Sequence, residues 1–213
     1  MKSNQYENKG TSDVHLTKER NYIIIMEKQI SPSIRNTKTY TLVVTALMAA
    51  VTCILAPLSI PIGPVPISLT NLAIYISLYV LDWKKGTISY LVYLLIGLVG
   101  VPVFSGFTGG VAKLAGPTGG YIIGFIPMAI IAGIAIDKYQ QRWIHLIGMI
   151  IGTVVCYAFG TLWFCLQSGT PLMSALSLCV FPFIPGDLIK MIIAIAIAPI
   201  IREKIDKIKF PQN

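Results

Sequence analysis

Residues 183–201 read FIPGDLIKMIIAIAIAPII, an apolar stretch that contains two ionisable residues, Asp187 and Lys190. A helix needs about 20 predominantly apolar residues to cross a bilayer, and this stretch is close to that length. Five more apolar segments precede it, most of them of similar length: 40–57, 66–81, 86–104, 119–136 and 143–167. The sequence therefore predicts an all-α integral membrane protein with six transmembrane helices.

The composition of the whole chain supports this class. Of its 213 residues, 54% are hydrophobic and 12% are charged, and the mean hydropathy is +0.72. Soluble domains carry about 25% charged residues, and a soluble domain of this size could not bury so much apolar surface. A soluble enzyme, a disordered chain and a secreted disulfide scaffold are excluded. The four cysteines lie in apolar segments without a Cys-x-x-Cys pair, so we expect no metal site.

The distribution of charge predicts the domain limits and the orientation. Residues 1–37 form a polar tail, residues 38–205 the six-helix membrane domain, and residues 206–213 a second tail; translation could start at Met1 or at Met26. Of the 17 Lys and Arg residues, 15 fall in the tails or in the loops on the same side; the exceptions are Lys113 and Lys190. Because positive loops stay in the cytoplasm, we expect both termini there. No nucleic-acid-binding motif accompanies the basic charge, so we expect no nucleic-acid partner.

The two charges of the last span are the first candidates for a binding site. Asp187 and Lys190 are three residues apart, so they project from one face of a helix, close to its outer end. An ionisable residue within a span costs about 2.5–3.5 kcal/mol at the bilayer centre and so needs a physical reason. Two interpretations stay open: an internal ion pair, and a polar ligand site that opens to the exterior.

A glycine-rich outer loop, residues 104–121, is the second candidate feature. Its backbone is permissive, and it could be a flexible connector or a lid over Asp187; its glycines are Gly106, Gly109, Gly110, Gly116, Gly119 and Gly120. Side chains that could also contact a ligand are Asn71, Lys113, Tyr121 and Trp163. The chain has no Gly-x-Ser-x-Gly, no His-Glu-x-x-His and no nucleotide-binding loop. We therefore expect no enzyme activity, and any solute accumulation needs energy from another subunit.

Four strings of residues point to a family. They are PVPISLT (64–70), GVPVFSG (100–106), GPTGGY (116–121) and FIPGDLIK (183–190). In this order they resemble the biotin-specific S component, the BioY family, of energy-coupling-factor (ECF) transporters. The resemblance covers about residues 38–205.

The resemblance implies a six-helix subunit of the bacterial plasma membrane that captures biotin from the outer side. The acid and lysine of the last helix would bind the vitamin, and these map to Asp187 and Lys190. Ala46 and Ala50 match a pattern that docks a transmembrane coupling subunit, which works with two cytoplasmic ATPases. This chain would hold no cofactor, since its partners use the ATP. The alternatives are an S component for thiamine or riboflavin, or a small channel or membrane enzyme.

Overall fold

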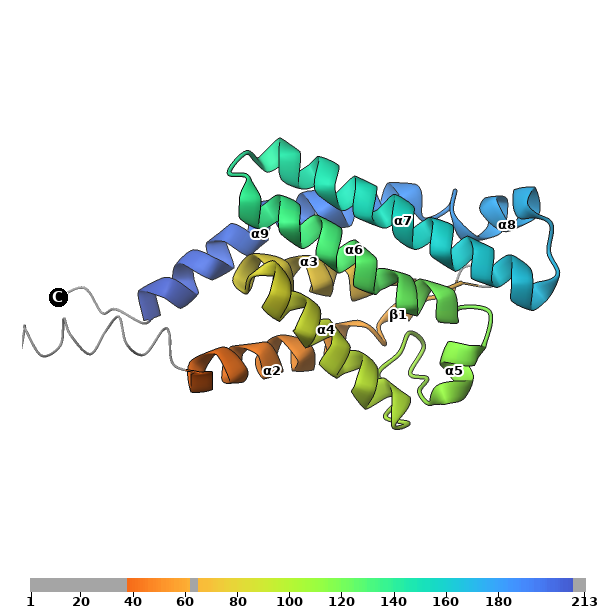
Figure 1. The fold of residues 1–213 in the computed structure, drawn as a ribbon, viewed down its shortest axis with the longest axis horizontal. Helices are drawn as coiled ribbons and strands as arrows, with labels where there is room; N and C mark the ends of the chain where they lie inside the picture. Colours follow the sequence, from red (N-terminus) through yellow and green to blue (C-terminus); the bar gives the residue numbers. More distant parts are fainter. Residues whose placement is uncertain (1–37, 62–64, 209–213) are drawn as a thin grey trace, which may run out of the picture.

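The computed structural model describes residues 38–61 and 65–208. Within these ranges the chain forms eight helices and one small sheet (Figure 1). The helices are α2 (Lys38–Leu55), α3 (Thr70–Val80), α4 (Trp83–Leu98), α5 (Val111–Ala115), α6 (Gly119–Lys138), α7 (Arg142–Ser168), α8 (Leu172–Cys179) and α9 (Ile184–Ile208). The predicted amino-terminal tail, with both possible start residues, lies outside the described residues.

The mostly helical fold is confirmed. Four of the described helices, α2, α6, α7 and α9, are long and apolar enough to cross a membrane. The expected segments 66–81 and 86–104 were too long, because α3 has 11 residues and α4 has 16. A strand precedes α3, and α4 ends before Gly100, whose positive φ of 109° breaks the helical conformation.

Three loops contain short structure that their sequence did not predict. In the loop after α2, strand β1 (Ser59–Ile60) pairs antiparallel with β2 (Ile67–Ser68). The glycine-rich loop contains α5, and residues 168–182 contain the eight-residue helix α8. At 1.5 Å per residue α8 is about 12 Å long, too short to cross the bilayer.

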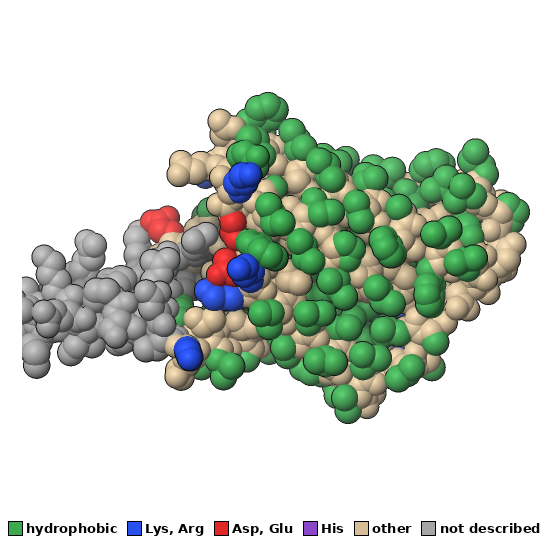
Figure 2. All heavy atoms as spheres, in the orientation of Figure 1, with side chains coloured by type: hydrophobic (Ala, Val, Ile, Leu, Met, Phe, Trp, Pro, Cys, Tyr) green, Lys and Arg blue, Asp and Glu red, His purple; other side chains and the backbone are tan. Residues whose placement is uncertain are grey.

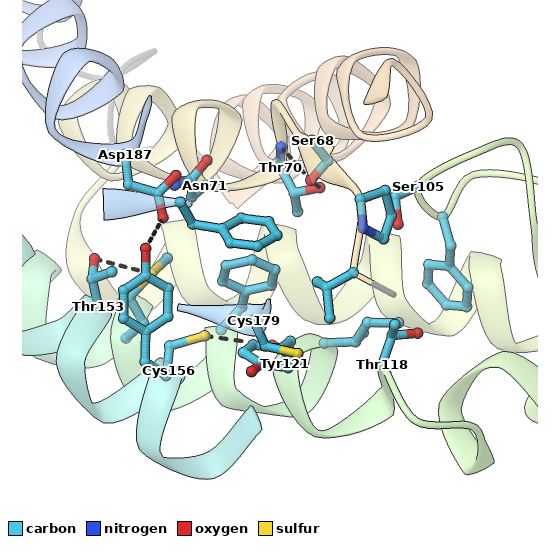
Figure 3. A pocket seen from close by; sticks show the side chains of 18 of the residues that line it. Ser68, Thr70, Asn71, Ser105, Thr118, Tyr121, Thr153, Cys156, Cys179 and Asp187 are labelled. Atoms are coloured by element: carbon cyan, nitrogen blue, oxygen red, sulfur yellow. Dashed lines mark hydrogen bonds between the residues drawn. The ribbon is translucent and has the colours of Figure 1, made fainter. Parts of the chain in front are cut away.

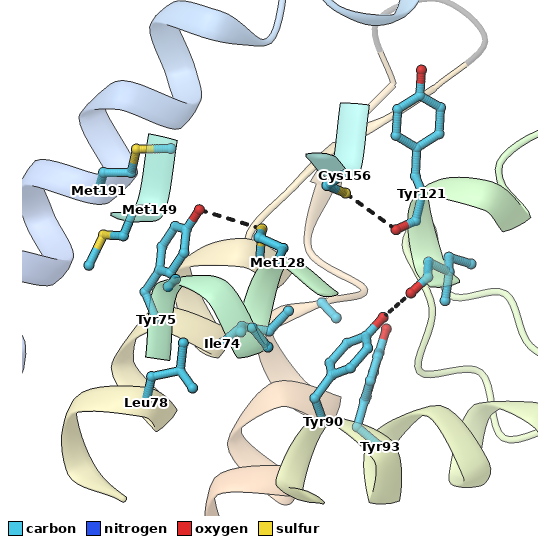
Figure 4. Close-up of a cluster of buried hydrophobic side chains, with 14 of the residues drawn as sticks. Ile74, Tyr75, Leu78, Tyr90, Tyr93, Tyr121, Met128, Met149, Cys156 and Met191 are labelled. Carbon is cyan, nitrogen blue, oxygen red and sulfur yellow. Dashed lines mark hydrogen bonds between the residues drawn. The ribbon is translucent and has the colours of Figure 1, made fainter. Parts of the chain in front are cut away.

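Helices α6 and α7 pack closely through small residues. A Cβ atom added to Gly124 would lie 3.1 Å from the Cys156 carbonyl oxygen, and one added to Gly152 would lie 2.9 Å from that of Met128. Small residues four apart let helices in a membrane approach closely, as the Gly-x-x-x-Gly spacings of both helices predict. The buried cluster beside this seam includes Tyr75, which donates a hydrogen bond to the Met128 sulfur at 3.5 Å (Figure 4).

The two ends of the bundle differ in charge. The charged side chains visible on the surface gather at the end where α2 begins, while the remaining surface is largely hydrophobic (Figure 2). The α3–α4 and α6–α7 connections lie at this same end, and the glycine-rich loop, the β-hairpin and α8 lie at the other (Figure 1). The lysines and arginines of the α3–α4 and α6–α7 connections are thus separated in space from the glycine-rich loop.

Candidate functional site

A cavity lies at the end of the bundle away from the charged connections (Figure 3). It is enclosed by residues of α3, α4, α6, α7 and α9 together with the hairpin and the glycine-rich loop. The space within it that no protein atom occupies, including the part open to solvent at its mouth, is about 730 Å³.

Asp187 and Lys190 form an ion pair in the cavity wall. The Lys190 ammonium donates to Asp187 Oδ1 at 2.9 Å, and the two residues are 7% and 8% exposed. Asp187 lies in the first turn of α9, where the positive end of the helix dipole favours a carboxylate. The helical spacing seen in the sequence thus does bring both charges to one face.

Two partners of this pair come from distant parts of the chain. The Tyr157 hydroxyl on α7 donates to Asp187 Oδ2 at 2.6 Å, and Lys190 also donates to the Ser68 carbonyl oxygen on β2 at 2.7 Å. Neither Tyr157 nor Ser68 was predicted from the sequence. A signal for Tyr157 was present, because it and Thr153 place two hydroxyls four residues apart in the otherwise apolar stretch 146–160 of α7.

The polar wall keeps hydrogen-bonding capacity for a ligand. A carboxylate offers about four acceptor positions and an ammonium three donors, and the pair uses two of each in the contacts above. Asn71, 4% exposed, lines the same cavity, and its side-chain oxygen accepts from the Leu72 amide at 3.1 Å. That bond leaves the two N–H donors of the Asn71 amide for other partners.

The opposite wall is aromatic. Tyr90 and Tyr93 of α4, Phe104 of the glycine-rich loop and Phe125 of α6 all line the cavity. The rings of Tyr93 and Phe104 meet edge to face with centroids 5.7 Å apart, and those of Tyr90 and Phe125 at 6.0 Å. A site that combines one buried ion pair and a few polar side chains with an aromatic wall suits a small ligand that has a few polar groups on an apolar frame.

Comparison with known proteins gives the family. The model described as the BioY family matches residues 26–207. The chain belongs to the BioY family. The match is wider than the resemblance read from the sequence, and it begins within the segment assigned to the polar tail.

Relatives and a solved structure agree with this membership. The biotin transporter BioY2 of Lactococcus lactis subsp. cremoris is 38% identical over 160 residues, which are 75% of this chain and 88% of the relative. The biotin transporter BioY of Thermotoga maritima is 37% identical over 158 residues, 74% of this chain and 92% of the relative. The crystal structure of the S-component for biotin from an ECF-type ABC transporter superposes with a TM-score of 0.71 at 38% identity, covering 79% and 93% of the two chains.

The remaining candidate side chains of this BioY chain separate into two groups. Tyr121 lines the cavity with Asn71, and its hydroxyl shares a 3.0 Å hydrogen bond with Thr161. Lys113 and Trp163 are not among the described residues that line the cavity. Lys113 is half-buried on α5, and this burial lowers the pKa of its ammonium.

Trp163 instead holds the glycine-rich loop against α7. Its indole N–H donates to the Gly116 carbonyl oxygen at 3.0 Å, and a Cβ atom at Gly120 would collide with its side chain. The loop itself borders the cavity through Phe104, Ser105 and Thr118. Its role as a lid stays a prediction.

Two structural features explain why the loop contains glycine at these positions. Gly106 and Gly110 have positive φ values of 75° and 87°, which other residues rarely adopt. Gly109 and Gly119 lie so close to backbone carbonyl groups that no side chain fits, and Gly116 is the acceptor of the Trp163 bond.

Two other groups of predicted residues also have defined positions. Ala46 and Ala50 are exposed on α2, on a surface that also exposes Leu47. Their role in docking a partner stays a prediction. Within residues 38–61 and 65–208 no group of three His, Cys, Asp or Glu side chains could hold a metal ion.

Proposed function

We propose that this chain is the substrate-binding membrane subunit that captures biotin from the outer side for ATP-driven uptake by an ECF complex. The observation that carries the proposal is the buried Asp187–Lys190 pair, hydrogen-bonded by Tyr157, in a cavity of a BioY-family chain that also has an aromatic wall. The family's named members are biotin transporters, so the subunit acts by binding and delivery rather than by catalysis.

The chemistry of biotin matches the cavity. Its ureido ring presents two N–H donors and one carbonyl acceptor, and its valerate chain ends in a carboxylate. Asp187 can accept from a ureido N–H, while the free donors of Lys190 and Asn71 can bind a carbonyl or carboxylate oxygen. The thiophane ring and the aliphatic chain then pack against the aromatic wall formed by Tyr90, Tyr93, Phe104 and Phe125.

We also propose the orientation and the number of spans. The charged end of the bundle faces the cytoplasm, so both termini lie inside and the cavity opens outward. The chain crosses the membrane six times, through α2, α3, α4, α6, α7 and α9. The short helix α3 fits this arrangement because it packs within the bundle, where protein rather than lipid surrounds the non-helical backbone ahead of it.

Energy for release into the cell comes from partners. We propose that the exposed face of α2 around Ala46 and Ala50 binds a transmembrane coupling subunit, which works with two cytoplasmic ATPases. This chain needs no cofactor of its own for that task. A ligand alone shifts the equilibrium only toward the state that binds it better, so inward release requires the ATP-driven change of the partners.

A vitamin panel tests the substrate. Purified protein in lipid nanodiscs is titrated with biotin, thiamine and riboflavin under identical conditions, and heat release is measured. We expect saturable binding of biotin and none of the other two vitamins. Saturable binding of thiamine or riboflavin without biotin binding would contradict the proposal and favour the alternative S component.

A further inference from the structure

A second cavity lies on the other side of the Asp187 wall. It is a groove between α7, α8 and α9, and its lining is almost entirely apolar. The side chains along it include Val154, Ala158 and Leu162 of α7, Leu176 of α8 and Leu188 of α9. This groove, here called the α7–α9 groove, is distinct from the candidate biotin cavity.

The polar groups in the lining of the α7–α9 groove are already engaged. The Thr153 hydroxyl bonds Tyr75 at 2.7 Å, and the Thr161 hydroxyl bonds Tyr121 at 3.0 Å. The Tyr157 hydroxyl donates to Asp187, whose other oxygen accepts from Lys190. A polar ligand would therefore find few partners here, whereas a hydrocarbon chain needs none.

The groove is continuous with the surface that faces lipid. Both α7 and α9 are long and apolar enough to cross a membrane, and Val154, Leu162 and Leu188 at the groove are 58%, 61% and 39% exposed. Along α7 its lining runs from Ile150 to Leu162, about 18 Å at 1.5 Å per residue. One leaflet of the hydrocarbon core is about 15 Å thick, so the groove has the length of one acyl chain.

The wall between the two cavities is thin. Thr153, Tyr157 and Asp187 line both the α7–α9 groove and the candidate biotin cavity. Any molecule that fills the groove therefore packs against Tyr157, which donates a hydrogen bond to Asp187. An apolar occupant keeps water from the Tyr157–Asp187 hydrogen bond and so strengthens it.

We propose that the α7–α9 groove holds one acyl chain of a phospholipid, which forms the membrane-side support of Tyr157 and Asp187. The acyl chain belongs to a lipid of the outer leaflet, which rests on the membrane orientation given in the proposed function. The occupant is a phospholipid because the groove opens along helices that are in contact with the bilayer.

Photo-cross-linking tests the occupant without any vitamin. The protein is reconstituted in nanodiscs with phosphatidylcholine that carries a diazirine in the middle of one acyl chain, and modified peptides are mapped by mass spectrometry. We expect adducts concentrated on the residues of the α7–α9 groove. Adducts spread evenly over all exposed apolar faces would overturn the proposal, and this measurement needs no variant.

Two matched substitutions sharpen the test. Ala158→Trp places a large side chain in the groove, whereas Ala196→Trp makes the same change at an exposed position of α9 outside its lining. We expect Ala158→Trp to lose most of the groove adducts and Ala196→Trp to keep them, with both variants eluting as folded monodisperse protein. Groove adducts that persist in folded Ala158→Trp would overturn the proposal.

A photo-reactive residue tests for a protein occupant instead. p-Benzoylphenylalanine in place of Leu162, an exposed residue of the groove lining, is activated in intact cells. A lipid adduct is expected, and a covalent adduct with another polypeptide would overturn the proposal. Because none of these measurements uses biotin, failure of the groove proposal is distinguishable from failure of the biotin proposal.

Discussion

Neutralising Asp187 is the perturbation that separates a binding role of the buried pair from a structural one. Asp187→Asn keeps the side-chain volume but removes the negative charge that Lys190 contacts at 2.9 Å and Tyr157 at 2.6 Å. Losing a hydrogen bond to a charged group costs about 1.5–3 kcal/mol, which corresponds to about 10- to 150-fold in biotin affinity. We expect a loss of this size in an isothermal titration.

The same substitution also affects folding, so stability is measured alongside affinity. Lys190 is 8% exposed, and leaving one member of a buried ion pair without its partner costs about 3–5 kcal/mol. The double variant Asp187→Asn/Lys190→Met removes both charges and should regain most of this stability. If the pair binds biotin, the double variant folds well and still binds poorly.

A matched control and a clear refutation complete the design. Ile189→Met changes an exposed neighbour on the same helix and should leave biotin affinity unchanged. Thermal unfolding and biotin titration are run on wild type, on Asp187→Asn, on the double variant and on this control. A stable double variant with wild-type affinity would refute the binding role and leave an internal ion pair as the explanation.

Three further predictions concern the Tyr157–Asp187 hydrogen bond, the proposed coupling surface on α2 and the orientation in the membrane. Tyr157→Phe removes the donor to Asp187, so biotin affinity should fall roughly 2- to 13-fold, for about 0.5–1.5 kcal/mol; an unchanged titration would contradict this. Ala46→Trp or Ala50→Trp should abolish uptake by the complete complex while the isolated subunit binds biotin normally; equal loss of both would indicate packing within the subunit. In a cysteine-free background, Lys113→Cys and Lys84→Cys should react with impermeant maleimide from opposite sides of the membrane, and labelling from one side would contradict the topology.

The features that the sequence alone predicted are those that depend on neighbours along the chain. Membrane class follows from apolar segment length, and the pairing of Asp187 with Lys190 follows from their three-residue spacing on one helix. The close approach of α6 and α7 follows from glycines four residues apart. Helix ends were predicted less well, because the hairpin before α3 and the positive φ of Gly100 depend on contacts within the loops.

The composition of the cavity wall was decided by the tertiary structure. Tyr157 and Ser68 are 30 and 122 residues from their partners, so no local spacing relates them to Asp187 or Lys190. Trp163, chosen from the sequence as an aromatic ligand contact, instead binds the backbone of the glycine-rich loop. A periodic pattern determines which face of a helix is apolar, but the crossing of helices determines which side chains on that face meet. By itself, then, the sequence determined the membrane class and the paired charges of the last helix, while the packing of α3, α7 and α9 decided which groups surround that pair.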